Sequence, residues 1–107
     1  MSLSIIIPVY NESRNLEKTV NNLIKLKKRI KKLNLIFIDD FSTDNTYDLV
    51  KKLSKKNSFI KIFKNKKKGL GSAIEKGFKK CRFKYVAIFM ADSSDSIDDL
   101  IKYYKMF

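Results

Sequence analysis

The sequence predicts an α/β fold: a three-layer α/β/α arrangement around a doubly wound, mostly parallel sheet. Apolar runs typical of buried strands alternate with segments of helical periodicity. A polar or acidic residue follows three of these runs, at Tyr10, Asp39 and Asp92. Because strands that alternate with helices are joined by right-handed crossovers, we expect a parallel sheet in the order 3-2-1-4. Ligands of such sheets bind beyond the carboxyl ends of the strands.

The elements are justified in chain order by their apolar patterns. We expect strands at residues 4–9, 34–39, 59–63 and 84–90, and helices at residues 13–32, 44–55, 71–80 and 96–104. The first helix has one apolar face, formed by Leu16, Val20, Leu23, Ile24 and Ile30. The third helix spaces Leu70, Ile74 and Phe78 four residues apart. Residues 96–99 resemble a capping box with Asp in the usual Glu place, which favours a last helix starting at Ser96.

Length and composition indicate one domain over residues 1–107, because 107 residues that are 44% hydrophobic can bury one core. Cys81 is the only cysteine, which excludes an intrachain disulfide and fits a reducing compartment, although it also suits a small apolar position in a helix. The chain has no His, which excludes Ser-His-Asp, Cys-His and His-zinc chemistry and leaves carboxylates as candidate groups.

No apolar run approaches the roughly 18 residues of a membrane span, and we expect a soluble, cytoplasmic chain without an export signal.

The formal charge of +13, from 24 basic and 11 acidic residues, would attract phosphates, nucleic acid or an anionic membrane. The lysines cluster within residues 25–32, 51–56 and 64–68. Most of these positions fall at helix ends or in loops, where Lys offsets the helix dipole and keeps a small domain soluble. We favour this solvated role over a dedicated polyanion patch.

The first two strand ends carry candidate nucleotide-binding residues. After the first strand, Tyr10 could stack on a base or ribose and Glu12 could accept a hydroxyl proton, although a simple strand-to-helix turn has the same pattern. Asp39 and Asp40 close the second apolar run. For Asp39 we favour a role in ligand binding, because it lies at the carboxyl end of a strand, where ligands of such sheets bind. For Ser42 and Asp44 we favour helix capping.

Two later segments suggest phosphate and metal binding. Residues 68–73 and Gly77 place small residues before and inside the third helix, which allows a phosphate-facing role but is neither the dinucleotide fingerprint nor the P-loop. After the fourth strand, Asp92 and Asp95 offer the oxygen ligands that a hard divalent cation prefers. A turn that caps the following helix is the alternative for Asp95.

These segments, at residues 5–12, 38–46, 68–77 and 89–92, together resemble the nucleotide-binding half of family 2 glycosyltransferases of the GT-A fold, the nucleotide-diphospho-sugar transferase type. Within that group they look most like the enzymes that transfer a hexose to dolichyl or other polyprenyl phosphates. The resemblance implies that Pro8, Tyr10, Glu12 and Asp39 surround the nucleoside of a nucleotide-diphosphate sugar. It also implies that Ala91 and Asp92 lie against the ribose and diphosphate, with Asp92 holding Mg²⁺ or Mn²⁺ and so serving catalysis.

The sequence departs from the family pattern in two ways. Met90 stands where the usual Asp-x-Asp has its first carboxylate, so Asp95 is a second candidate metal ligand. The family also continues beyond this length into an acceptor half that holds the catalytic base. We therefore expect a truncated, donor-binding half that is inactive alone and self-associates through apolar surface.

The resemblance implies a role in glycan biosynthesis, with a polyprenyl phosphate acceptor at the cytoplasmic face of a membrane and no nucleic acid partner. The alternative is a non-catalytic nucleotide- or polyanion-binding α/β module. A receiver domain is disfavoured for two reasons. Its acidic pair follows the first strand, whereas Asp39 and Asp40 follow the second strand of this sequence. It also needs an Asp after its third strand, where this sequence has Lys64 and Asn65.

Overall fold

The computed structural model describes residues 2–90 and the backbone of residues 102–105. In chain order, its elements are β1 (Ser2–Val9), α1 (Ser13–Lys25), a 3₁₀ turn η1 (Leu26–Lys28), β2 (Lys32–Asp39), α2 (Thr46–Lys56), β3 (Ile60–Lys64), α3 (Leu70–Lys80), β4 (Tyr85–Ile88) and β5 (Lys102–Lys105).

The strands form one sheet in the order β3-β2-β1-β4-β5. Strands β1 to β4 run parallel to one another, which confirms the predicted fold class and the order 3-2-1-4. In the register between β1 and β2, Val9 lies beside Asp39. β1 pairs with β4 only as far as Ile6, so Pro8, which has no N–H to donate, lies past the end of that ladder.

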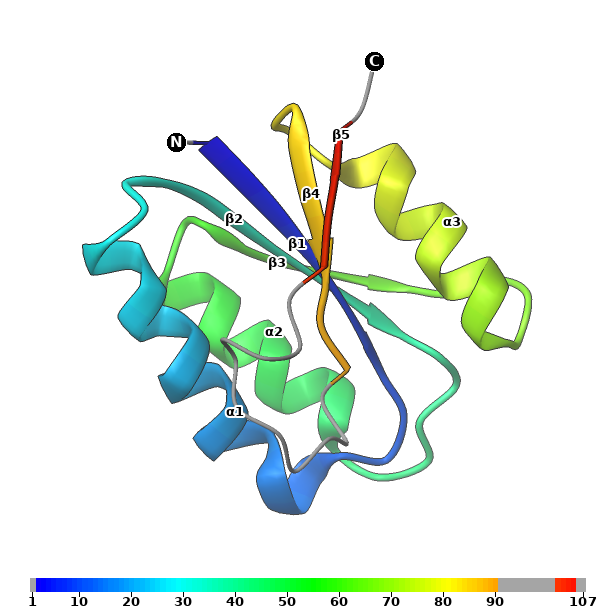
Figure 1. The fold of residues 1–107 in the computed structure, drawn as a ribbon. Helices are drawn as coiled ribbons and strands as arrows, with labels where there is room; N and C mark the ends of the chain where they lie inside the picture. Colours follow the sequence, from blue (N-terminus) through cyan, green and yellow to red (C-terminus); the bar gives the residue numbers. More distant parts are fainter. Residues whose placement is uncertain (1, 91–101, 106–107) are drawn as a thin grey trace.

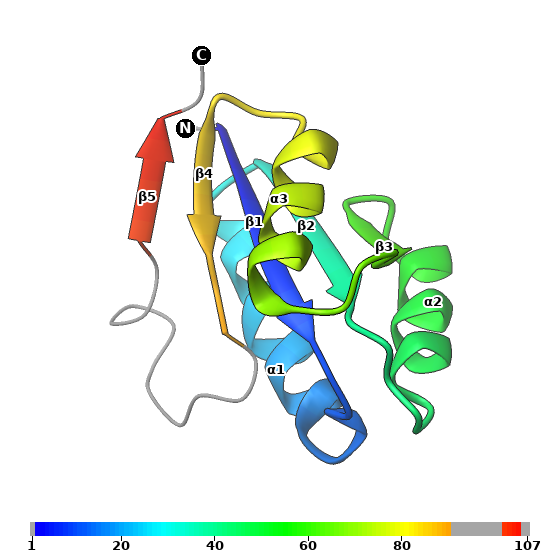
Figure 2. The same cartoon turned by 90° about the vertical axis from the view of Figure 1, so that its right-hand side faces the viewer.

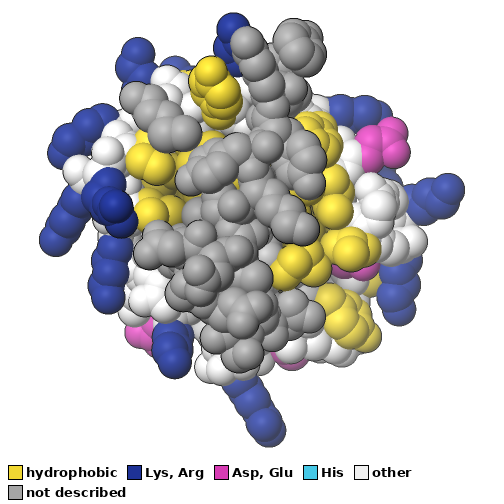
Figure 3. Space-filling view, viewed as in Figure 1, with side chains coloured by type: hydrophobic (Ala, Val, Ile, Leu, Met, Phe, Trp, Pro, Cys, Tyr) yellow, Lys and Arg dark blue, Asp and Glu magenta, His cyan; other side chains and the backbone are white. Residues whose placement is uncertain are grey.

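Helices cover both faces of the sheet, as doubly wound folds require. α1 and α2 lie on one face and α3 on the other (Figures 1 and 2). Strand side chains alternate between two cores: Ile5 and Ile7 pack with Leu16 and other residues on the first face, and Ile6 packs with Ala73 on the second. Figure 3 shows Lys and Arg side chains projecting around the margin of one view of the molecule, as expected for solvated lysines.

Two predicted helices differ from the structure. α1 ends at Lys25 rather than at residue 32, because Lys32 enters the sheet beside Ser2. Like charges one turn apart, such as Lys28 and Lys32, also disfavour a continued helix. The predicted helix over residues 96–104 is wrong at residues 102–104, which belong to β5; its first part lies outside the described residues.

β5 adds to the free edge of β4 in the antiparallel direction, with Val86 beside Tyr104. Its two adjacent tyrosines favour a strand, since aromatic residues are enriched there. Among the described residues, none of the helices has both the length and the apolar character needed to span a membrane.

Candidate nucleotide-binding site

The candidate site lies at the carboxyl edge of the parallel strands. The register that sets Val9 beside Asp39 brings the loops after β1 and β2 to the same place. A backbone hydrogen bond from Asp40 N to Val9 O, 2.9 Å long, joins the two loops where they leave the sheet. Tyr10 and Asp39 are therefore brought together, as the sequence predicts.

Asp39 is the most distinctive group at this edge. Its side chain is 4% exposed, and its Oδ1 atom has no hydrogen-bond partner within the described part of the chain. A buried carboxylate oxygen without a donor is costly, because it has lost its hydration and gained nothing in return. Since an ionised carboxylate can only accept hydrogen bonds, Asp39 is suited to a ligand that presents an N–H or O–H.

Asp40 has a different role from its neighbour. Its carboxylate accepts hydrogen bonds from Gly69 N at 3.0 and 3.2 Å and from the Asn65 side-chain amide at 3.0 Å. Gly69 has φ +135°, a backbone conformation that L side chains rarely adopt, and α3 starts directly after it. Asp40 therefore anchors the loop between β3 and α3 to the end of β2. The sequence assigned no separate role to Asp40 and did not identify this anchor.

The same loop brings Lys68 to the site. The Lys68 ammonium lies 5.5 Å from the centre of the Tyr10 ring, within cation–π range. Tyr10 is 47% exposed, so its ring remains accessible beside this cation. The phosphate-facing role of residues 68–73 stays a prediction, whereas Gly77 serves another purpose. A Cβ at Gly77 would lie 2.4 Å from Ile6 Cγ2, so this glycine permits close packing of α3 on β1.

Asn11 joins the loops after β1 and β2. It has φ 49°, in the left-handed region that Asn tolerates better than most residues. Its Oδ1 accepts hydrogen bonds from Thr43 N at 2.8 Å and Asp44 N at 3.3 Å, and its own N–H donates to Ser42 Oγ at 3.0 Å. Asn11 was not among the predicted site residues; the signal in the sequence was an Asn between an apolar strand and a helix.

Asp44 completes this connection at the start of two helices. Its Oδ2 accepts a hydrogen bond from Ser13 N at 3.3 Å, and its Oδ1 accepts from Thr46 N at 3.0 Å and from the Thr46 hydroxyl. The Thr46 hydroxyl is the main reason why the pKa of Asp44 falls from 3.8 to about 2. Thr46 Oγ1 in turn accepts a hydrogen bond from Glu12 N at 2.9 Å. Asp44 is thus structural and accepts the first N–H of each helix, although the cap position of α2 is Asn45. The capping prediction is wrong for Ser42, whose hydroxyl accepts from Asn11 N instead.

The other predicted site residues divide into two groups. Pro8 is buried within β1, and Glu12 is half-buried at the first turn of α1. Ala91, Asp92 and Asp95 lie outside the described residues. The described residues just before them, after β4, continue alongside β1 toward the carboxyl edge of the sheet, because Phe89 N donates a 3.0 Å hydrogen bond to Ile6 O.

The part of the chain that the structure describes holds no cluster of three Cys, Asp or Glu side chains able to bind a metal ion. Met90 is half-buried at the end of this part, and its thioether is a poor ligand for a hard cation. Asp39 is buried, and Asp40 is hydrogen-bonded to the loop before α3. A metal would therefore depend on the carboxylates that follow Met90.

Comparison with known proteins gives one consistent answer. The family model described as "Glycosyl transferase family 2" matches residues 4–107. The chain is 33% identical over 91 residues to the poly-beta-1,6-N-acetyl-D-glucosamine synthase of Staphylococcus aureus, strain COL, covering 85% of this chain and 22% of that protein. It is 35% identical over 94 residues to the dolichol-phosphate mannosyltransferase of Pyrococcus furiosus, covering 86% and 26%. The chain thus spans about a quarter of the length of these relatives.

Solved structures share the fold. S. aureus TarS 1-349 in complex with UDP-GlcNAc superposes with a TM-score of 0.74 at 25% identity, over 86% of this chain and 27% of the TarS 1-349 chain. GalNAc-T7 with UDP, GalNAc and Mn²⁺ superposes with a TM-score of 0.71 at 26% identity, over 84% of this chain and 17% of the other.

Proposed function

Because the chain belongs to glycosyltransferase family 2, we propose that residues 1–107 hold the donor site of an enzyme that transfers a sugar from a nucleotide-diphosphate sugar. The observation that carries this proposal is Asp39: a buried carboxylate with an unpartnered oxygen at the carboxyl edge of a parallel sheet, close to the exposed Tyr10. The relatives named above support it, since two solved structures of the same fold contain UDP-GlcNAc or UDP.

In this proposal the nucleoside binds between Tyr10 and Asp39. The Asp39 carboxylate accepts a hydrogen bond from the base, which selects bases with an N–H on the pairing edge, namely uracil or thymine at N3 or guanine at N1 and N2. Cytosine presents an unprotonated N3 there and fits less well. Tyr10 offers its ring to the base or ribose, and Lys68, beside that ring, offers a positive charge to the diphosphate.

We assign the divalent metal to Asp92, with Asp95 as its second ligand. Mn²⁺ in the GalNAc-T7 structure supports a divalent ion, and the choice between Mg²⁺ and Mn²⁺ belongs to the proposal. A bound divalent ion neutralises the charge that develops on the departing nucleoside diphosphate. Pro8, Glu12 and Ala91 complete the proposed donor site, with Glu12 held in place by its backbone bond to Thr46.

For the acceptor we propose a polyprenyl phosphate at the cytoplasmic face of a membrane. The support is the name of the P. furiosus relative, a dolichol-phosphate mannosyltransferase, which matches 86% of this chain. The S. aureus synthase matches 85% of this chain and is named for a polymeric N-acetylglucosamine product, so a growing glycan is the alternative acceptor.

Calorimetric titration with UDP-, GDP-, CDP- and dTDP-sugars, with and without Mn²⁺, tests the donor site. We expect UDP-, dTDP- or GDP-sugars to bind better than CDP-sugars, and Mn²⁺ to tighten binding. Asp39→Asn should weaken the preferred donor about tenfold or more, because a charge-assisted hydrogen bond contributes about 1.5–3 kcal/mol. Asp48→Asn, at an exposed position in the first turn of α2, is the matched control and should bind normally. Equal binding by both variants would refute the role of Asp39.

The metal assignment has its own test. Asp92→Asn should remove the Mn²⁺-dependent part of donor binding, since the amide keeps the shape but loses the charge. Met90→Asp should tighten Mn²⁺ binding by restoring the first carboxylate of the family motif. If Asp92→Asn retains full metal dependence, the assignment to Asp92 is wrong and Asp95 takes its place.

A further inference from the structure

A second candidate surface lies between α3 and the edge strand β3, away from the donor site. The small residues Ala73 and Gly77 seat α3 over β1 and β2, where Ile6 and Ile36 form the core on that face. The neighbouring side of β3 is left less covered: Lys61 is exposed and Phe63 is half-buried. We call the depression between these elements the α3–β3 groove.

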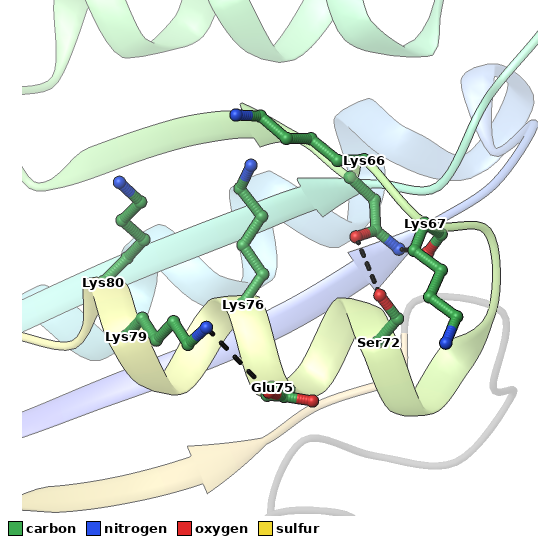
Figure 4. A pocket seen from close by; sticks show the side chains of 8 residues that line it. Lys66, Lys67, Ser72, Glu75, Lys76, Lys79 and Lys80 are labelled. Carbon is green, nitrogen blue, oxygen red and sulfur yellow. Dashed lines mark hydrogen bonds and ion pairs between the residues drawn. The ribbon is translucent and has the colours of Figure 1, made fainter.

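Two hollows make up the groove, with volumes of about 510 and 750 Å³, and both are lined by Lys80. In the smaller hollow, the side chains of Lys66, Lys76 and Lys80 extend toward the space between α3 and the strands (Figure 4). Lys79 instead turns toward Glu75, to which its Nζ lies at 3.9 Å. The larger hollow continues toward the amino ends of the strands, past Lys61 and Arg82.

The charge in the groove is strongly unbalanced. Glu75 is the only carboxylate among the residues that line the smaller hollow, and none lines the larger one. The pKa of Lys76 is lowered by partial burial and by the neighbouring charges of Lys66, Lys80 and Lys79. Like-charged ammonium groups that line one hollow repel one another, and an anion bound among them would offset that repulsion.

The aromatic residues of the groove indicate which kind of anion fits. The Lys80 ammonium lies 4.8 Å from the centre of the Phe63 ring, and the Arg82 guanidinium lies 5.7 Å from the centre of the Phe83 ring. Phe63 and Phe83 are half-buried and each has a cation over one face, so they offer less stacking surface than the 47% exposed Tyr10 of the donor site. The groove therefore presents mainly charge, and its concave shape suits a single chain better than the flat surface of a bilayer.

We propose that the α3–β3 groove binds a linear, phosphate-bearing polymer through charge alone, with Lys66, Lys76 and Lys80 as its central contacts. None of the donor-site residues Tyr10, Glu12, Asp39 and Lys68 lines either hollow, so the two sites use different side chains, although both adjoin the loop between β3 and α3. The groove is expected to be insensitive to bases and to bind long chains far better than single phosphates, because several contacts act together.

Medium-chain inorganic polyphosphate is the probe, measured by fluorescence anisotropy at several salt concentrations. The triple variant Lys66→Gln, Lys76→Gln, Lys80→Gln should lose about tenfold or more in affinity, and its log–log salt slope should fall by about 2, since each lost contact removes about 0.7. The control is Lys51→Gln, Lys52→Gln, Lys55→Gln, which removes the same charge from exposed positions on α2. It should bind within about twofold of the unchanged protein. Circular dichroism confirms that both variants fold.

Further arms separate the sources of phosphate. Oligouridylate and oligoadenylate with the same number of phosphates should bind equally, and orthophosphate should compete only weakly. The proposal is overturned if both triple variants lose the same affinity, which indicates diffuse attraction. It is also overturned if orthophosphate binds as tightly as the polymer, if one base is strongly preferred, or if the groove variant loses binding to phosphatidylglycerol vesicles but not to polyphosphate.

Discussion

Replacing Gly77 with Ala tests how closely α3 packs on the sheet. A Cβ at this position would lie 2.4 Å from Cγ2 of Ile6, 3.0 Å from its Cγ1 and 3.1 Å from its Cδ1. Carbon atoms pack best at about 3.5–4.0 Å, so α3 must move away from β1 by roughly 1 Å. Ile6 is fully buried in the middle of the sheet and has little freedom to move instead.

The expected cost follows from two opposing effects. Overpacking of this kind destabilises by about 1–3 kcal/mol, and Ala regains up to about 1 kcal/mol of helix propensity over Gly. We expect a net loss of about 1–2 kcal/mol, or roughly 4–16 °C in Tm for a domain of this size. Urea unfolding followed by circular dichroism measures the free energy directly.

Gly71→Ala is the matched control on the same helix, because a Cβ there meets no atom within 4 Å. It should leave the free energy of unfolding unchanged or raise it by up to about 1 kcal/mol. If Gly77→Ala is as stable as Gly71→Ala, the close approach of α3 to β1 is wrong.

Three further predictions concern individual side chains. Hydrogen bonds lower the pKa of Asp44 from 3.8 to about 2. The ionised carboxylate therefore stabilises the fold fully above pH 3.8, and this stabilisation is lost as the pH falls toward 2. Asp44→Asn should remove this part of the pH dependence of unfolding, and an unchanged pH profile would contradict the prediction. Asp40→Ala should cost about 1–3 kcal/mol in urea unfolding, because Gly69 N loses its acceptor; a negligible loss would refute the anchor. Burial raises the pKa of the Cys81 thiol from 9.0 to about 11. Alkylation of this thiol at pH 8 should therefore be about a hundredfold slower in the folded than in the unfolded chain. Equal rates would show that the thiol is exposed.

The sequence predicts the sheet because the strand signals are strong and local. Unbroken runs such as Ile5–Ile7 and Leu35–Ile38 have no polar side and fit only a sheet covered on both faces. The end of α1 was harder to predict, since Lys27 and Lys28 suit a helix locally, and only pairing of Ser2 with Lys32 draws the following residues into β2. β5 depends likewise on a free edge of β4, which local periodicity does not reveal.

The candidate site was partly predictable for the same reason. Tyr10 and Asp39 each follow an apolar run, and the parallel topology then brings both to one edge. The hydrogen bonds of Asn11, Asp40 and Asp44 join residues about 30 positions apart, so nothing in the adjacent sequence indicates their partners. Gly77 was read as a small residue near a phosphate, whereas its neighbour in space is Ile6.

The central claim is that a nucleotide sugar binds at the carboxyl edge of the sheet, and backbone amide NMR tests it most directly. The ¹⁵N-labelled chain is titrated with UDP-GlcNAc and, separately, GDP-mannose in the presence of Mg²⁺. One of them should shift the amide signals of Tyr10, Asp39 and Gly69 in a saturable way and leave those of Lys76 and Lys80 in the α3–β3 groove unchanged. Saturable shifts confined to the groove, or no shifts with either donor, would contradict the proposed donor site.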